Sequence, residues 1–208
     1  MSVPDLPSWP TLGLRLLLIA GALAAWFGTQ RLIGRRCAPQ ESMDDALHRL
    51  TAPANAWLHR HPRAADALLV GSSLWIDVVT LFVLARALLG PDFTPFWGLL
   101  GLFAARQACQ ALVALPAPPG IIWRPPGFPS LFVTYQVGND FFFSGHTALA
   151  VYGALQVSAL GLPWLGGLAI AMAVAEIGVV IALRAHWTLD VIAGAAAAIV
   201  AGYTDGAL

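Results

Sequence analysis

Charged residues are scarce in this chain, and lysine is absent altogether. Of its 208 residues only 11% are charged, whereas 58% are hydrophobic, and all 11 basic residues are arginine. Soluble domains carry about a quarter charged residues. The composition therefore excludes an ordinary soluble enzyme and predicts one integral-membrane domain over residues 1–208. The net charge is zero, and we expect no nucleic-acid partner.

Cysteine is rare as well. Cys37 and Cys109 are too few and too far apart for a disulfide framework or a metal site, and we expect neither a metal nor another cofactor. The absence of lysine, together with much alanine, leucine and glycine, is typical of a GC-rich bacterial genome. We therefore expect a location in a bacterial inner membrane.

Long apolar runs, by contrast, are plentiful. A spanning helix needs about 20 predominantly apolar residues, and the chain has six candidate runs, several of them ended by glycine or proline. The first ten residues lack the basic region of a signal peptide, so we expect the first run to be retained. The sequence predicts an all-α polytopic membrane protein, a six-transmembrane-helix bundle, with spans at about Thr11–Ile33, Ala67–Leu89, Thr94–Leu115, Ser144 to Gly161, Trp164–Leu183 and Thr188–Tyr203.

Two loops stand out between these spans. The polar stretch Gly34–Asp66 is predicted to form an interfacial helix between spans one and two, with a solvated linker as the alternative. Its apolar side chains would lie on the bilayer (Leu47, Leu50, Trp57, Leu58) and its polar ones would face headgroups (Arg49, His59, Arg60, His61). We expect His48, His59 and His61 to be surface residues. The loop Pro116–Phe143, rich in proline and aromatic residues, predicts either a lid over a lipid headgroup or an aromatic belt.

The strings Ser144-Gly145-His146-Thr147 and His186-Trp187-Thr188-Leu189-Asp190 each open an apolar run. Titratable groups are costly where hydrocarbon meets water, so they indicate function. Two predicted spans separate the strings, and crossing the membrane twice returns the chain to the same face. His146 and His186 are therefore expected at one site.

His186 and Asp190 are four residues apart and share one face of a helix. The aspartate can accept the Nδ1 proton and leave Nε2 free as a nucleophile. A His–Asp pair that only caps the helix is the alternative. In the other string, Ser144 is a favoured helix cap, Gly145 lets a phosphate approach the backbone, and protonated His146 can act as a general acid.

Phosphate oxygens also need positive charge. Arg106 lies within an apolar run, where an arginine indicates function. Arg184, two residues before His186, is a second candidate phosphate ligand, or an interface anchor. Asp140 could orient a histidine or a headgroup, or shape the turn. Asp77 and Glu176, inside predicted spans, could pair with Arg106, contact a headgroup or stay neutral.

These residues resemble those of a known family. Gly138–Thr147, with Asp140 and Ser144-Gly145-His146-Thr147, is similar to the Cys-Gly-Asp…Ser-Gly-His-Thr motif of sphingomyelin synthases, and His186–Val191 to their His-Tyr-Thr-x-Asp-Val motif. Arg106 and Leu115–Pro118 resemble their upstream arginine and Leu-Pro segment. The resemblance covers about residues 106–201, the expected catalytic half, and reaches the wider superfamily of type 2 phosphatidic-acid phosphatases. The chain departs from it at Gly138, Asn139 and Trp187, and it lacks the lysine-bearing motif of the ordinary phosphatases.

The resemblance implies that His186 is the nucleophile, Asp190 its activator and His146 the leaving-group acid, without a metal. The expected function is transfer of a phosphoryl group or phospho-headgroup from a phospholipid to a ceramide- or diacylglycerol-type acceptor. A phosphatase or phospholipase C-like hydrolase, with water as the acceptor, is the alternative on the same site. A non-catalytic lipid-binding or transport protein is the alternative of a different class.

The side of the membrane stays open at this point. Six arginines flank or occupy the first loop, which would share a face with the site: Arg31, Arg35, Arg36, Arg49, Arg60 and Arg63. The positive-inside rule makes this face cytoplasmic, whereas the family resemblance implies the exoplasmic face. Binding of anionic headgroups by these arginines is a further interpretation.

Overall fold

The structure is a computed structural model that describes residues 6–35, 43–135 and 141–208. Within these residues the chain forms eight α-helices and no strand. The helices are α1 (Trp9–Gly34), α2 (Ala46–Leu50), α3 (Ala52–Arg60), α4 (Pro62–Leu89), α5 (Thr94–Leu112), α6 (Gly145–Ser158), α7 (Pro163–Ala182) and α8 (Thr188–Thr204).

Local signals explain where the long helices begin and end. Proline occupies the first turn of α1, α4, α5 and α7, where its missing N–H costs nothing. Helix α4 stops at Gly90, and its last carbonyls are satisfied from another helix. Arg15 of α1 donates Nη1 to the carbonyl oxygens of Ala87, Leu88 and Gly90, at 3.1, 3.3 and 2.8 Å.

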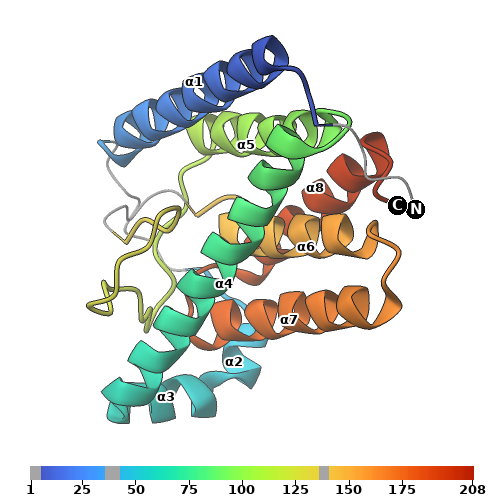
Figure 1. Cartoon of the computed structure of the whole chain (residues 1–208). Coiled ribbons are helices and arrows are strands. Elements are labelled where there is room, and N and C mark those ends of the chain that lie inside the picture. The colour runs from blue at the N-terminus through green and yellow to red at the C-terminus, as the bar shows by residue number, and fades with distance from the viewer. Residues whose placement is uncertain (1–5, 36–42, 136–140) are drawn as a thin grey trace.

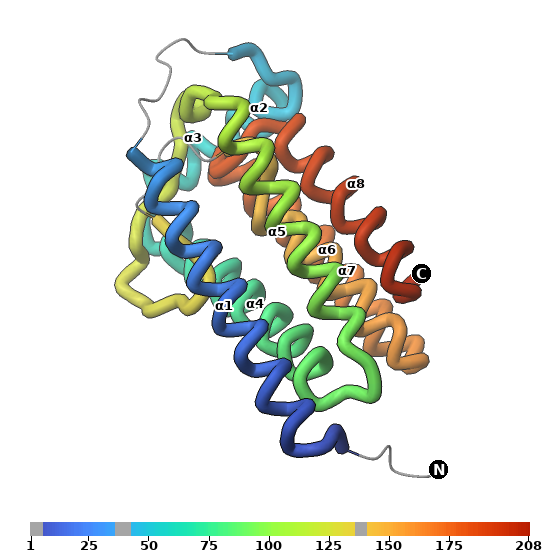
Figure 2. The backbone as a smooth tube through the Cα atoms, turned by 90° about the horizontal axis from the view of Figure 1, so that it is seen from above, coloured from blue at the N-terminus to red at the C-terminus, as the bar shows by residue number. Residues whose placement is uncertain are grey.

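The six long helices alternate in direction (Figures 1 and 2). Helices α1, α5 and α7 finish at the end of the bundle where α4, α6 and α8 begin. We call this the loop end, because the loop residues 113–135 and 141–144 lie there, and we call the opposite end the far end. Helix α6 packs against α4, α7 and α8, while α1 packs against α4 and α5 at the edge.

All six predicted runs are helical, with ends within a few residues of those expected, except that α4 starts five residues early. Three helices, α1, α4 and α7, are long and apolar enough to cross a membrane, with mean hydropathies of 1.7, 2.1 and 2.2. Large apolar side chains such as Leu17, Leu74 and Val174 are exposed on their outer faces, as lipid contact requires. These helices indicate a membrane protein. Since α6 has 14 residues and α8 has 17, the count of six spans stays a prediction.

The described part of the predicted interfacial segment contains the short helices α2 and α3, which lie at the loop end. Leu47, Leu50 and Trp57 are exposed as expected. Leu58 is not, because it is buried against Ala65 and Leu69 of α4 and Leu183 after α7. The prediction of a bilayer-facing Leu58 is therefore wrong: one face of α3 packs on the protein.

Candidate active site

His186 lies in the short turn between α7 and α8. Helix α7 ends at Ala182, and two residues later Arg184 has φ 54°, a left-handed conformation that is uncommon for a residue with a side chain. The Arg184 guanidinium holds this turn by donating to the carbonyl oxygens of Pro119 and, at 3.1 Å, of His48. Helix α8 then starts at Thr188, with Asp190 in its first turn accepting from the Trp187 backbone N–H at 3.0 Å.

The ring of His186 is held through its Nδ1 atom. Nδ1 lies 2.9 Å from the carbonyl oxygen of Phe141 and 3.6 Å from Oδ2 of Asp190. Because a carbonyl oxygen can only accept, Nδ1 carries the proton and Nε2 keeps its lone pair. Nε2 makes no hydrogen bond with any described residue.

The spacing of His186 and Asp190 predicts that the aspartate can accept the Nδ1 proton, but in the structure the carbonyl oxygen of Phe141 is the closer acceptor. The Asp190 carboxylate is fully buried at ion-pair distance from the ring, so it can stabilise a positive charge that develops there. Asp190 also caps α8 by accepting from the backbone N–H of Trp187, as the capping alternative predicts.

The second string forms the start of α6. Ser144 is the helix cap, as predicted, and its Oγ accepts from the backbone N–H of Thr147 at 3.3 Å. Its own N–H donates to the carbonyl oxygen of Asp190 at 3.0 Å. A Cβ on Gly194 would lie 2.6 Å from the Ser144 carbonyl oxygen. The absence of a side chain there lets the starts of α6 and α8 touch.

His146, the second residue of α6, has a Nε2 atom that is buried and has no hydrogen-bond partner in the described part of the chain. The rings of His146 and Trp123 pack in a T-shaped arrangement, with centroids 5.0 Å apart. A buried polar atom without a partner costs free energy, of the order of 1–3 kcal/mol. Such an atom is expected where a ligand supplies the missing bond.

Arg106 reaches this region from α5. Its side chain is buried, and Nε donates to the carbonyl oxygen of Phe143 at 3.0 Å, while Nη1 lies 3.4 Å from Oε1 of Gln30 on α1. A Cβ on Gly145 would lie 3.1 Å from Arg106 Nε. Glycine therefore allows the guanidinium to pack directly on the start of α6.

These groups surround one cavity of about 50 Å³. Since about 10–15 Å³ holds one water by this kind of measure, a group of phosphoryl size fits. The lining combines His146, His186, Arg106 and Gly145 with mostly apolar side chains, namely Trp26, Ile76, Phe103, Trp123, Phe132, Thr134, Phe141, Leu149 and Ala185. The structure thus brings together both histidines and the arginine from three different helices or turns.

Other predicted residues lie elsewhere. Arg184 does not line the cavity, because its guanidinium is turned towards backbone carbonyls. Asp190 stands behind His186, and Ser144 is enclosed beneath the start of α6. Asp140 lies outside the described residues.

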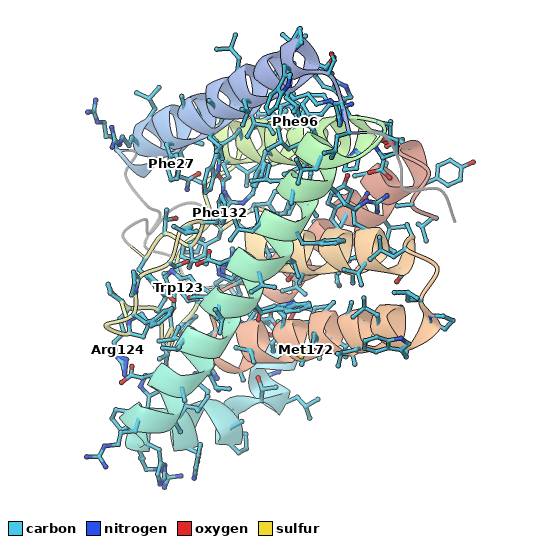
Figure 3. The ribbon with its side chains drawn as sticks, viewed as in Figure 1. Phe27, Phe96, Trp123, Arg124, Phe132 and Met172 are labelled. Carbon is cyan, nitrogen blue, oxygen red and sulfur yellow. The ribbon has the colours of Figure 1, made fainter. Side chains whose placement is uncertain are left out.

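The two acidic residues within the predicted spans also have protein partners. Asp77 on α4 accepts from Ser130 Oγ at 3.0 Å and from the N–H groups of Leu131 and Phe132 at 3.0 and 3.1 Å. Asp77 thereby anchors the loop rich in proline and aromatic residues that follows α5, which we call the aromatic loop. Trp123 and Phe132 of this loop, both labelled in Figure 3, line the cavity. Glu176 on α7 accepts from Ser72 Oγ at 2.6 Å.

Helix α2 and its cap contribute to the site, which the sequence did not predict. His48 was expected at the surface, yet it is buried: its ring stacks on Trp187, and Nε2 donates to the His186 carbonyl oxygen at 3.0 Å. Asp45 accepts from both the N–H and Oγ1 of Thr188 at 2.7 Å. The prediction failed because the sequence around a histidine in a polar segment does not show whether another part of the protein packs against it. Asp45, a good helix cap, was the available signal.

The Asp45 contact also changes the acidity of that carboxyl group. Burial opposes ionisation, but the hydrogen bonds from the Thr188 side chain and backbone outweigh it and lower the pKa of Asp45 below its ordinary value. We call the Asp45–Thr188 and His48–His186 contacts the α2 clamp.

No protein-family model, no curated protein and no solved structure matches this chain. In the part of the chain that the structure describes, no group of three or more histidine, cysteine, aspartate or glutamate residues is placed to hold a metal ion.

Proposed function

We propose that the protein is a six-span membrane enzyme of a bacterial inner membrane that moves a phosphoryl group or phospho-headgroup from a phospholipid to a lipid acceptor of ceramide or diacylglycerol type. One observation carries the proposal. His186, with Nε2 free, and His146, with Nε2 buried and unpartnered, line one cavity together with Arg106. The resemblance to sphingomyelin synthases and type 2 phosphatidic-acid phosphatases supports the same reaction.

In the first step, His186 Nε2 attacks the phosphorus of the donor lipid. A P–N bond forms as the P–O bond to the leaving alcohol breaks, and protonated His146 gives its Nε2 proton to the leaving oxygen. The ring of His186 becomes positively charged. The carbonyl of Phe141 holds its Nδ1 proton, and Asp190 at 3.6 Å stabilises the charge. Arg106 balances the charge on the phosphoryl oxygens.

In the second step, the acceptor hydroxyl attacks phosphorus, and His146, now neutral, takes its proton. The P–N bond breaks and His186 is restored. Water in place of the lipid hydroxyl would give the phosphatase or phospholipase C-like reaction from the same intermediate. The two outcomes differ only in which hydroxyl reaches the cavity.

The test is product analysis with purified protein and labelled phospholipids, with and without ceramide or diacylglycerol. The wild type should move label to the lipid acceptor, and His186→Ala should reduce the rate by at least about 10⁴-fold. Release of label to water alone would select the hydrolase. If no group leaves any lipid, or if His186→Ala equals the wild type, the protein is a non-catalytic lipid-binding or transport protein instead.

The side of the membrane follows from a separate experiment. With six spans, the C-terminus at the far end lies opposite the site (Figure 1). The test fuses to Leu208 a reporter that works only in the cytoplasm. If the reporter is active, the C-terminus is cytoplasmic and the site lies on the exoplasmic face. If it is inactive, the site lies on the cytoplasmic face.

A further inference from the structure

A second, larger opening lies beside the catalytic cavity, between the last turns of α1 and the aromatic loop. Its volume is about 600 Å³. From α1 it is lined by Phe27, Gln30, Arg31, Gly34 and Arg35, and from the loop by Pro125, Phe128, Ser130, Val133, Thr134 and Tyr135. We call it the α1–loop groove. Figures 1 and 2 both show this end of α1 beside the loop, and Figure 3 shows Phe27 on that side of the helix.

The groove has a polarity gradient along α1. Phe27, Arg31 and Arg35 follow one another at four-residue spacing and so share one helix face. Phe27 lies nearer the middle of the helix, whereas the two arginines stand at its end. Phe128 and Val133 add apolar side chains to the lining from the loop. This order matches a lipid, with acyl chains towards the bundle centre and a headgroup at its end.

The two arginines are free to bind an anion. Both are exposed, and neither has an ion-pair or hydrogen-bond partner among the described residues. Other arginines are engaged: Arg124 pairs with Asp66 at 2.7 Å, and Arg86 donates to Gln156. None of the described residues that line the groove is a carboxylate, and Asp77, which lies next to Ser130, already accepts from three donors, namely Ser130 Oγ and the N–H groups of Leu131 and Phe132.

The groove adjoins the catalytic cavity. Thr134 lines both spaces, and Phe27 of the groove follows Trp26 of the cavity in sequence. Gln30, in the groove lining, accepts from Arg106 of the cavity at 3.4 Å. The groove and the catalytic cavity are therefore neighbouring spaces with Thr134 lining both.

Lipid can reach the groove directly. Helix α1 is the edge helix, and most of its side chains, including Leu14, Leu17 and Leu32, are exposed. A lipid could enter laterally from the bilayer without leaving it.

We propose that the α1–loop groove binds the donor lipid and selects a glycerophospholipid whose headgroup has a net negative charge. The inference rests on the proposed function. Two cationic side chains without a carboxylate favour an anionic headgroup, whereas the ammonium of a zwitterionic headgroup would face like charge. Arg31 and Arg35 then bind the substrate. For this reason they should not be counted among the positive residues when the positive-inside rule is used to assign the membrane side.

The test measures binding separately from catalysis. Full-length His186→Ala protein in detergent is analysed by native mass spectrometry with phosphatidylglycerol and phosphatidylcholine of equal chain length. We expect preferential retention of phosphatidylglycerol, and a loss of this preference by about ten- to thirtyfold in Arg31→Gln/Arg35→Gln. Arg60→Gln/Arg63→Gln, with the same charge change at the same end but outside the groove, should keep the preference.

Two further measurements distinguish the proposal from a folding defect and from binding of a free anion. Arg31→Lys/Arg35→Lys keeps the charge and should keep the preference, which separates charge from folding. If sn-glycerol 3-phosphate displaces the lipid at equal concentration, the arginines bind a free anion and the proposal is overturned. It is also overturned if the glutamine and control pairs behave alike.

In the active enzyme, the glutamine pair should raise KM for an anionic donor and leave kcat unchanged. Turnover of no lipid by the wild type would contradict the proposed function alone. The binding preference of the His186→Ala protein would be measured regardless, so the two failures are distinguishable.

Discussion

The far-end residues described next and the two site histidines at the loop end differ in whether their buried polar atoms have hydrogen-bond partners. At the far end, Arg86 donates to Gln156, Gln156 and Tyr152 both donate to Asp205, and Tyr152 also contacts the Pro95 carbonyl at 3.0 Å. Every member of this far-end network is matched by another. At the loop end, His146 Nε2 has no partner and His186 Nε2 makes no hydrogen bond within the described residues.

This difference predicts which residues contribute to stability and which contribute to function. A matched network strengthens packing and leaves nothing to bind with, because each donor is already used. A buried polar atom without a partner weakens the fold but keeps its hydrogen-bonding capacity for a ligand. We therefore expect changes at the loop end to alter turnover and changes at the far end to alter stability.

After that of His186→Ala, the largest effect is expected for His146, the proposed general acid. His146→Ala should lower the rate by about 10²–10⁴-fold, because the leaving alkoxide then departs without a proton. The loss should shrink with a donor whose leaving group is a nitrophenolate, which needs no proton. Equal losses for natural and activated donors would show that His146 does not protonate the leaving group.

A smaller effect is expected from crowding Arg106. In Gly145→Ala the new Cβ would lie 3.1 Å from Arg106 Nε, so the guanidinium must move, and the rate should fall about tenfold. Gly178→Ala in α7 is the matched control, because its Cβ would meet nothing within 4 Å. Steady-state rates of both variants decide the point, and equal rates would contradict the role given to Arg106.

The α2 clamp should affect the rate less again. Asp45→Asn weakens the contact with Thr188 and should cost about fivefold in kcat, the equivalent of about 1 kcal/mol, with KM unchanged. Thr51→Ala, at the other end of α2, tests whether any change in this segment has the same effect.

The clamp also has a predicted pH dependence. Because folding lowers the pKa of Asp45 from its ordinary value of 3.8, its stabilising contribution is complete well above pH 3.8 and is lost as the pH falls through the lower folded value. The protection factor of the Thr188 amide, which is its intrinsic exchange rate divided by its measured rate at the same pH, should therefore stay high at pH 5 and fall only below pH 3.8. A fall in protection already at pH 5 would refute the contact.

No effect on turnover is expected at the far end. Asp205→Ala removes the acceptor of Tyr152 and Gln156 and should lower the free energy of unfolding by about 1–3 kcal/mol. The activity per folded molecule should stay the same. Tyr203→Phe, exposed at the same end, serves as the control in thermal unfolding. A loss of activity without a loss of stability would break the comparison between the two ends.

Much of this arrangement could be predicted from sequence. Apolar runs bounded by proline, glycine and Ser144 located the long helices, and counting two runs between His146 and His186 placed both at one end. The partner of His186 Nδ1 could not be predicted, because Phe141 offers a backbone carbonyl that every residue has. The burial of His48 could not be predicted either, because it depends on tertiary contact with Trp187. The role of Asp77 depends on backbone N–H groups of a loop that is distant in sequence.

The central claim is that His186 attacks phosphorus through Nε2. Rapid quenching of the enzyme with a labelled phospholipid, followed by mass spectrometry and NMR of the modified peptide, identifies both the residue and the ring nitrogen. The account predicts a phosphorylated Nε2 on His186, because Nδ1 is bound to the Phe141 carbonyl at 2.9 Å. An adduct on His146 would reverse the two roles, and an adduct on Nδ1 of His186 would contradict the geometry on which the mechanism depends.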